Sequence, residues 1–241
     1  IRNGRGYGLA VEGGGDLTDF ENNTFADNQE GPVLIGPQRL GRLDAASDYA
    51  AGELDNRKFV RVLGSTIDEG TPQIWNAVNV PYVFSGKTDI QSGVEILAGA
   101  ELQFQDAASI EVNGSGYFQV HGEAGNRVTF TSERVPASRQ AGDWKGILYR
   151  SNHTQNEISH ADIHYGGHST RHSSATFENA NRANVMVTSV GGLHLDNVEL
   201  GYVPATRHGL ACEADSNVSF DAVTAVGIAD GFLMTAECIV D

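Results

Sequence analysis

The sequence predicts an all-β protein in which short parallel strands wind into a solenoid, a parallel β-helix. Pairs of apolar residues separated by one polar residue recur every eight residues in the middle of the chain, with turn-forming residues between the pairs. This alternation is typical of short strands with one buried side. Three such units form one rung, and rungs stack with parallel strands ~4.8 Å apart. The pairs are Val94/Ile96, Leu102/Phe104, Ile110/Val112 and Phe118/Val120, with Glu95, Gln103, Glu111 and Gln119 between their members.

Other secondary structures fit this pattern less well. On a helix, two residues that are two positions apart point in nearly opposite directions, so the pairs would not share a face. Hairpins are possible in principle, but their strands average about five to six residues and usually end in tight two-residue turns. Strands of three residues at a fixed spacing favour a three-sided coil.

Residues 1–40 are interpreted as the end of a preceding β-helix repeat unit. The segment GLAVE at 8–12 matches GLACE at 209–213, and Phe20 and Gly31 match Phe220 and Gly231 at nearly the same offset. The chain therefore combines parts of two copies of a ~200-residue unit. We expect further repeat units of the same parent chain to continue the coil.

Residues 41–80 are interpreted as a short connector between the two coil stacks. The segment LDAASDYAA at 43–51 has a helical composition, and Asp44 stands where it can cap a short helix. Trp75 and Pro81 precede the next coil. This connector is expected to be the irregular part of the chain.

Residues 81–241 are interpreted as a parallel β-helix unit, because the alternation continues beyond the octets. The inward positions are expected to be Val128/Phe130, Ile147/Tyr149, Ala161/Ile163/Tyr165, Val185/Val187, Leu193/Leu195, Leu210/Cys212 and Val218/Phe220. Cys212 is thus predicted to be buried. A free thiol is favoured there over a disulfide with Cys238, because the two cysteines match different parts of the rung.

Composition limits the classes of partner. The 241 residues carry 16 basic and 31 acidic side chains, a formal net charge of −15. This balance argues against binding to nucleic acid or anionic lipid, both of which need clustered basic residues. No apolar run approaches the ~20 residues of a membrane-spanning helix. An acidic surface suits a secreted protein.

Three segments resemble a known family. They are GDWKGI at 142–147, RVTFTS at 127–132, and the NEI and IHYG segments at 156–158 and 163–166. Together they resemble the right-handed parallel β-helix repeat proteins of bacterial surfaces, in the pectate-lyase-like superfamily, although Arg127 stands where that family usually has proline. The resemblance implies a right-handed coil and an extracellular, cell-surface location. It does not imply one function, because the superfamily includes polysaccharide lyases, adhesins and proteins without known activity. No catalytic residue is transferred from it.

Histidines suggest a metal site. His160, His164, His168 and His172 follow one another at steps of four, but Gly166 and Gly167 argue against a helix. On a strand, His160, Asp162 and His164 all point outward, and imidazole and carboxylate groups are ligands for zinc. The alternative is a solvated polar strand.

Calcium is a second candidate ion, because it prefers several convergent carboxylate and carbonyl oxygens. Glu95 and Gln119, 24 residues apart, are predicted neighbours, and the acidic turns at Asp16, Asp19 and Asp215 are comparable candidates. The alternative interpretation is that these side chains only keep the surface soluble. No cofactor is required by either reading.

Aromatic residues suggest a sugar-binding surface. Trp144 and Tyr149 can stack against a sugar ring, with Lys145 beside them, and the alternative is that both rings belong to the core. Lys145, Arg150 and His160 are the only group that suggests lyase chemistry, which needs a base near a sugar carboxylate.

The sequence thus predicts a non-catalytic structural or adhesive module of a bacterial surface or secreted protein, in contact with polysaccharide or cell-surface glycan. Two alternatives remain open. One is a polysaccharide lyase or glycoside hydrolase, and the other is a metal-binding surface module.

Overall fold

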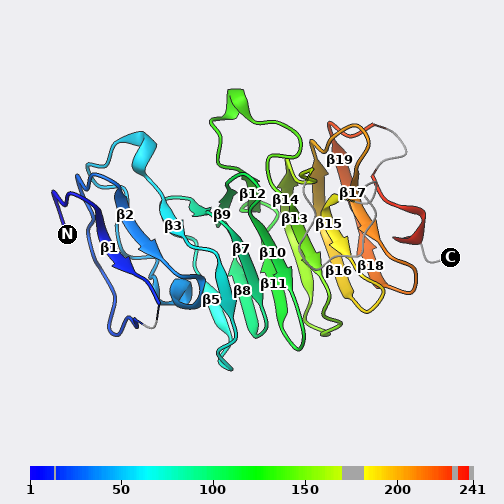
Figure 1. Cartoon of the computed structure of the whole chain (residues 1–241), viewed down its shortest axis with the longest axis horizontal. Coiled ribbons are helices and arrows are strands. Elements are labelled where there is room, and N and C mark those ends of the chain that lie inside the picture. Colours follow the sequence, from blue (N-terminus) through cyan, green and yellow to red (C-terminus); the bar gives the residue numbers. More distant parts are fainter. Residues whose placement is uncertain (14, 170–181, 230–232, 239–241) are drawn as a thin grey trace.

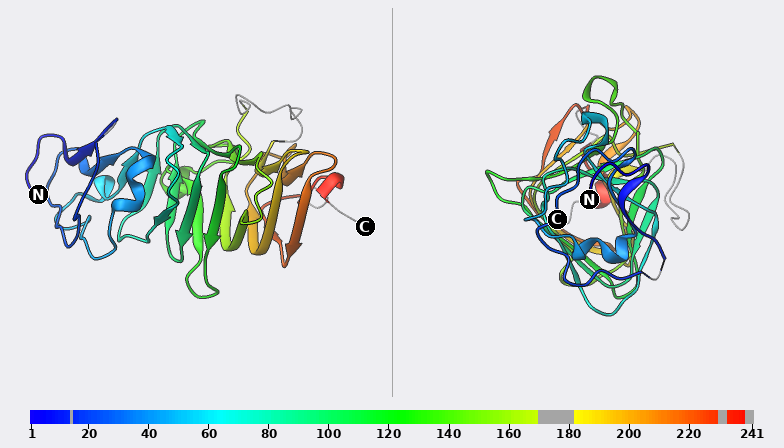
Figure 2. Two further views of the ribbon diagram at one scale, coloured as in Figure 1. Left: turned by 90° about the horizontal axis from the view of Figure 1, so that it is seen from below. Right: turned by 90° about the vertical axis from the view of Figure 1, so that its left-hand side faces the viewer.

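The computed structural model describes residues 1–13, 15–169, 182–229 and 233–238, and in these residues the chain is a parallel β-helix (Figure 1). The paired strands are parallel and belong to successive coils. Seen along the long axis, the strands surround a central core (Figure 2). Each regular coil passes through three faces in turn, which we number faces 1, 2 and 3. The described helices are short 3-10 turns, and none of them is long or apolar enough to cross a membrane.

The strands distribute over the three faces as follows. Face 1 contains β1 (Tyr7–Val11), β2 (Gly31–Ile35), β3 (Val60–Val62), β6 (Tyr82–Phe84), β9 (Glu101–Phe104), β12 (Val128–Ser132), the second halves of β14 (Glu157–His164) and β16 (Gly192–Gly201), and β19 (Thr224–Val226). Face 2 contains β4 (Ser65–Ile67), β7 (Lys87–Ile90), β10 (Ser109–Val112), β13 (Gly146–Tyr149), β15 (Ala183–Val187) and β17 (His208–Cys212). Face 3 contains β5 (Gln73–Trp75), β8 (Gly93–Leu97), β11 (Tyr117–His121), the first halves of β14 and β16, and β18 (Asn217–Asp221).

The predicted inward pairs from residue 94 to residue 120 are confirmed, since all of these side chains are fully buried. The predicted register is confirmed as well, because Glu95 lies opposite Gln119, a repeat of 119 − 95 = 24 residues. Like residues stack along the lumen: the ring centroid of Phe104 lies 5.1 Å from that of Phe84 and 6.4 Å from that of Phe130. Burial of each such ring contributes about 1.5–3 kcal/mol.

Two strands run across a corner between faces 3 and 1. β14 turns at His160, where φ is 48°, and β16 turns at Asn197, where φ is 53°. Arg127 holds both turns: its Nε lies 2.8 Å from Asp162, and its Nη2 donates to the carbonyl oxygens of Ala161 and Asn197. The arginine that replaces the usual proline of the resembling family therefore has a structural role here.

The connector expected over residues 41–80 contains three strands of the coil. β3, β4 and β5 pair with β6, β7 and β8, so the sheet passes through this segment without a break. The helix expected over residues 43–51 does not form. Asp44 instead accepts hydrogen bonds from the backbone N–H groups of Ala46 and Ser47 in a turn, and the Tyr49 ring is buried against Phe25. The helices on either side are the 3-10 turns η1 (Pro37–Arg42) and η2 (Asp55–Arg57).

The two segments that match in sequence, residues 8–12 and 209–213, lie on different faces of the coil. The first contains β1, on face 1, and the second contains β17, on face 2. Phe220 was expected to point inward but is 36% exposed. The reason is its position in β18, which pairs on one side only, with β16.

The prediction of a free thiol at Cys212 is wrong. Cys212 forms a disulfide with Cys238, and the two Cα atoms are 5.1 Å apart. After β17 the chain returns to face 2, where Met234 pairs with Leu210, and the 3-10 turn η5 (Ala236–Cys238) then brings Cys238 against the core. Comparison of positions within a rung did not reveal this turn.

Candidate functional site

The two aromatic rings predicted to stack on a sugar are both inaccessible. Trp144 and Tyr149 have 0% exposure. Trp144 stacks on Phe104 with ring centroids 4.0 Å apart, and its Nε1 donates to the His164 carbonyl oxygen at 2.7 Å. The Tyr149 hydroxyl donates to the Phe118 carbonyl oxygen, and burial raises its pKa well above the usual value. Both rings therefore belong to the core, and Lys145, which is half-buried, has no aromatic partner for a sugar beside it.

The predicted metal ligands are not brought together. His160 lies at the corner of β14, where its Nδ1 contacts the Ser159 hydroxyl at 2.9 Å. Asp162 pairs with Arg127, and His164 Nε2 lies 3.1 Å from Glu199. Across the part of the chain that the structure describes, no group of three or more His, Cys, Asp or Glu side chains could hold a metal ion.

Three of the other histidine and calcium candidates, His168, Glu95 and Asp16, contact neighbouring charged or titratable side chains. His168 Nε2 lies 3.0 Å from Asp106, and His172 lies outside the described residues. Glu95 pairs with His121 at 3.6 Å, and Asp16 lies 3.3 Å from Arg39. These contacts assign the side chains to ion pairs on the surface.

The pKa of His164, at the end of β14, is perturbed by its surroundings. Burial lowers its pKa, while the nearby carboxylates of Glu199 and Asp162 act in the opposite direction. The positive charge of Arg139 also lowers this pKa. Arg139 belongs to the loop between β12 and β13.

This loop forms one wall of a groove on the outer side of face 1. The loop protrudes from the coil in Figure 1 and contains the 3-10 turn η3 (Pro136–Ser138). The opposite wall is η2 with the residues that follow it. We call the space between them the basic groove; it has a volume of about 370 Å³. It is lined by Asp55, Asn56, Lys58, Phe59, Arg61, Pro81, Val83, Gln103, Glu133, Arg134, Val135, Pro136 and Arg139.

A buried carboxylate, two ion pairs and a cation–π contact fix the groove. Asp143, only 5% exposed, lies 3.1 Å from the Arg134 guanidinium and accepts a hydrogen bond from the Gln140 backbone N–H. Arg61 stacks over the Phe59 ring at 4.5 Å and reaches Glu133 on the loop at 3.4 Å. The loop is therefore tied both to its own base and to β3.

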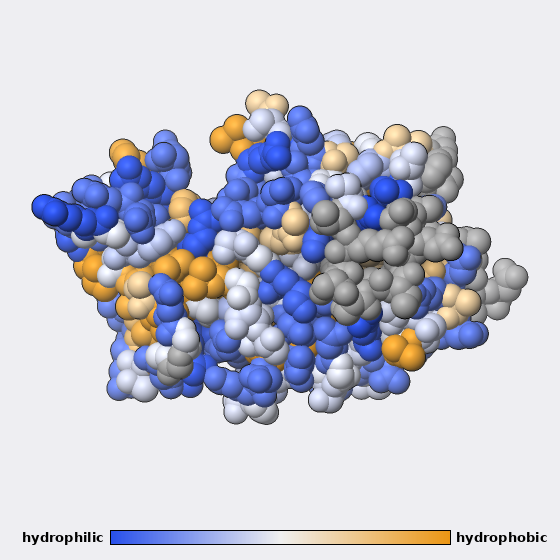
Figure 3. All heavy atoms as spheres, viewed as in Figure 1, coloured by the Kyte–Doolittle hydropathy of each residue, from blue (hydrophilic) through white to orange (hydrophobic). Residues whose placement is uncertain are grey.

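The chemistry of the basic groove is that of an anion-binding surface. Four basic and two acidic side chains line it, in a chain whose net charge is −15. Lys58 pairs with Asp55, whose side chain is 98% exposed, and such surface pairs are weak. Val135 is 69% exposed and adds an apolar rim. The outer surface is otherwise largely hydrophilic along the middle coils, as Figure 3 shows.

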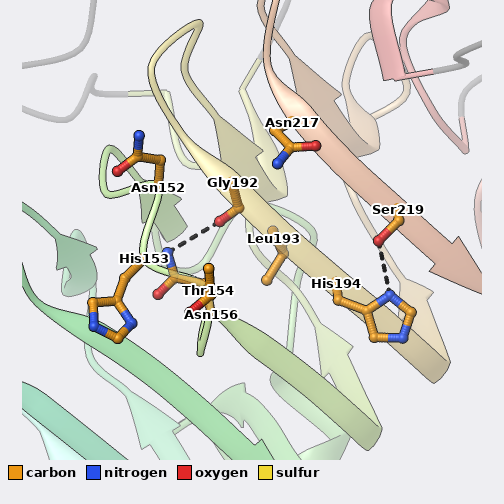
Figure 4. A pocket seen from close by; sticks show the side chains of 9 residues that line it. All are labelled: Asn152, His153, Thr154, Asn156, Gly192, Leu193, His194, Asn217 and Ser219. Carbon is orange, nitrogen blue, oxygen red and sulfur yellow. Dashed lines mark hydrogen bonds between the residues drawn. The ribbon is translucent and has the colours of Figure 1, made fainter.

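A second hollow lies between the turn before β14 and the strands β16 and β18 (Figure 4). Its volume is about 210 Å³, and its lining is polar. Asn156 is buried there and donates to the carbonyl oxygens of Ser151 and Gly192, while His194 is bonded to Ser219 at 2.9 Å. Because these groups already bond to one another or to backbone, the hollow has less unused binding capacity than the basic groove.

Comparison with known proteins finds no matching family model, curated protein or solved structure. The resemblance to bacterial-surface β-helix proteins thus stays a prediction. Sequence reasoning missed the basic groove, because its residues are far apart in the chain. One signal was present: Arg134 and Arg139 form a local cluster of positive charge in an acidic chain.

Proposed function

We propose that this chain is a non-catalytic structural and adhesive module of a bacterial surface or secreted protein, in contact with glycan. The observation that carries the proposal is the ladder of parallel strands, in which each coil pairs with the next around a filled apolar lumen. Such a stack is held by neighbour-to-neighbour contacts along its whole length. It therefore suits a rigid spacer that displays loops at its corners.

The disulfide supports a location outside the cytosol. Disulfides form and persist in oxidising compartments and are rare where glutathione keeps thiols reduced. The bond between Cys212 and Cys238 fastens the last described turn to the coil. The net charge of −15 favours solubility there.

The contacts of the polar side chains on β14 support a role without catalysis. Asp162 is neutralised by Arg127, and His164 is directed toward Glu199. His160 is displaced from both by the corner of β14. A general acid or base must reach the proton that it transfers, and these side chains are held by neighbours instead.

Two assays on the disulfide-bonded chain test the proposal. The first measures turnover on acidic and neutral polysaccharides, by the absorbance of unsaturated products and by new reducing ends, and no turnover is expected. Turnover that is abolished by Lys145→Ala or His160→Ala would overturn the non-catalytic role. The second measures binding of the chain to a glycan array. Binding to none of the glycans would overturn the adhesive role.

A further inference from the structure

We propose that the basic groove binds an extended polyanionic glycan, one whose sugar units carry carboxylate or sulfate groups. This inference rests on the proposed function, and it specifies the ligand class and the residues that recognise it. Lys58 lies on one wall, and Arg134 and Arg139 lie on the other. An anionic chain between them contacts positive charge from both sides.

The cations differ in how much of their charge is free. Arg61 is 17% exposed and is satisfied by Phe59 and Glu133, so it shapes the floor. Arg134 shares its charge with the buried Asp143. Arg139 donates through Nε to the Arg134 carbonyl oxygen, and among the described residues its Nη groups have no hydrogen-bond partner. Arg139 and Lys58 are therefore the main anchors for an added anion.

The floor of the groove favours a sugar chain over an extended peptide. Arg61, Val83 and Gln103 lie side by side on β3, β6 and β9, which are already paired to one another. Because no free strand edge lies in the floor, a peptide cannot bind there by adding a strand. A ligand there is recognised by side chains alone. Gln103 donates through Nε2 to Glu101, which leaves its Oε1 to accept a sugar hydroxyl.

The local charge of the groove is positive, which favours an anionic ligand. A chain with a net charge of −15 repels polyanions over most of its surface, so a local positive surface determines where such a ligand can bind. Binding is expected to weaken as salt screens these charges, over a Debye length of ~10 Å at 0.1 M.

The test measures binding of the disulfide-bonded chain by biolayer interferometry to four immobilised polymers: dextran sulfate, polygalacturonate, uncharged dextran and poly-glutamate. Binding to dextran sulfate, to polygalacturonate or to both supports the proposal and identifies the anionic group. The Lys58→Ala/Arg139→Ala variant should bind about fivefold or more weakly, since each surface charge contributes up to about 1 kcal/mol.

The matched control is Arg2→Ala/Arg5→Ala, which removes two exposed positive charges outside the groove. It should bind within about twofold of the original chain, and both variants should keep its melting temperature. Equal weakening in the two variants would overturn the groove as the site. Binding to uncharged dextran as strong as binding to the anionic polysaccharides would refute an anionic ligand. Binding to poly-glutamate as strong as binding to the anionic polysaccharides would refute a glycan-specific groove. Binding to dextran alone would leave the adhesive role intact while removing this inference.

Discussion

The side chain of Asn184 provides a quantitative test of how the corners of the coil are held. Asn184 is fully buried at the start of β15 on face 2. Its Oδ1 accepts a hydrogen bond from the Gly166 N–H at 2.7 Å, and its Nδ2 donates to the carbonyl oxygens of Ile163 and Gly201 at 2.8 and 2.9 Å. One amide therefore links the ends of two face 1 strands to the next face.

The Asn184→Ala substitution removes all three bonds. Gly201 O also accepts from the Tyr165 N–H, so it keeps a partner, whereas the Gly166 N–H loses its hydrogen-bond partner among the described residues. An unsatisfied buried group costs about 1–3 kcal/mol, and each lost bond adds about 0.5–1.5 kcal/mol. With the Gly166 N–H left unsatisfied and two further bonds lost, we expect the free energy of unfolding to fall by about 2–6 kcal/mol.

Urea unfolding, followed by circular dichroism and by tryptophan fluorescence, measures this change. Asn217→Ala is the matched control, because Asn217 is exposed, and it should change the free energy of unfolding by less than about 0.5 kcal/mol. Asn184→Asp keeps the shape but places a carboxylate oxygen against two carbonyl oxygens, so it should be at least as destabilising as alanine. A loss below about 1 kcal/mol in both Asn184 variants would refute the reasoning.

Three further predictions concern the disulfide, the core and the pH dependence of stability. Reducing the Cys212–Cys238 disulfide, or replacing both cysteines with alanine, should lower the free energy of unfolding by about 3 kcal/mol, measured by urea unfolding with and without reductant. An unchanged free energy of unfolding would contradict a stabilising role of this disulfide. Trp144→Phe should cost about 1.5–3 kcal/mol in the same assay and leave glycan binding unchanged, whereas weaker binding in a folded variant would return Trp144 to the ligand surface. Burial lowers the pKa of His164 in the folded chain, so the unfolded chain takes up more protons as the pH drops through about 6.5, and the free energy of unfolding should fall. Urea titrations at about pH 7.5 and 5.5 should show a smaller fall for His164→Gln than for the original chain. An equal fall in the two proteins would disprove the contribution of His164.

The alternation of residues was sufficient to predict the faces of the coil but not its corners. Between residues 94 and 120 a polar residue separates the two apolar residues of each pair, so the burial of the apolar residues and the register follow from the octet, although Glu111 is buried as well, with 1% exposure. Beyond β12 the loops lengthen the coil, and Gln119 pairs with Glu157, 38 residues later. Loop length changes the register without changing the period-two pattern within a strand, so the later pairings could not be read from spacing alone.

Local propensity misled where tertiary contacts decide the structure. The alanines near Asp44 favour a helix, but the Asp44 carboxylate bonds to backbone N–H groups of a turn, and the hydroxyl of the buried Tyr49 donates to the Asp44 carbonyl oxygen. His160 alternates with Asp162 and His164 in the sequence, yet the positive φ at His160 turns the strand and separates His160 from the other two. A one-residue corner leaves no trace in a pattern of period two.

The corners are also where the chain can acquire binding surfaces. On the faces, backbone groups are paired with neighbouring coils and the inward side chains fill the lumen, so a change there costs packing energy. At a corner, an insertion needs only local anchors: Asp143 fixes the base of the loop that carries Arg134 and Arg139, and Glu133 ties it to Arg61. The buried Asp143 belongs to the same GDWKGI segment whose tryptophan packs in the lumen. One short segment thus anchors both the core and the groove, which allows the rest of the loop to vary in charge while the coil beneath it stays the same.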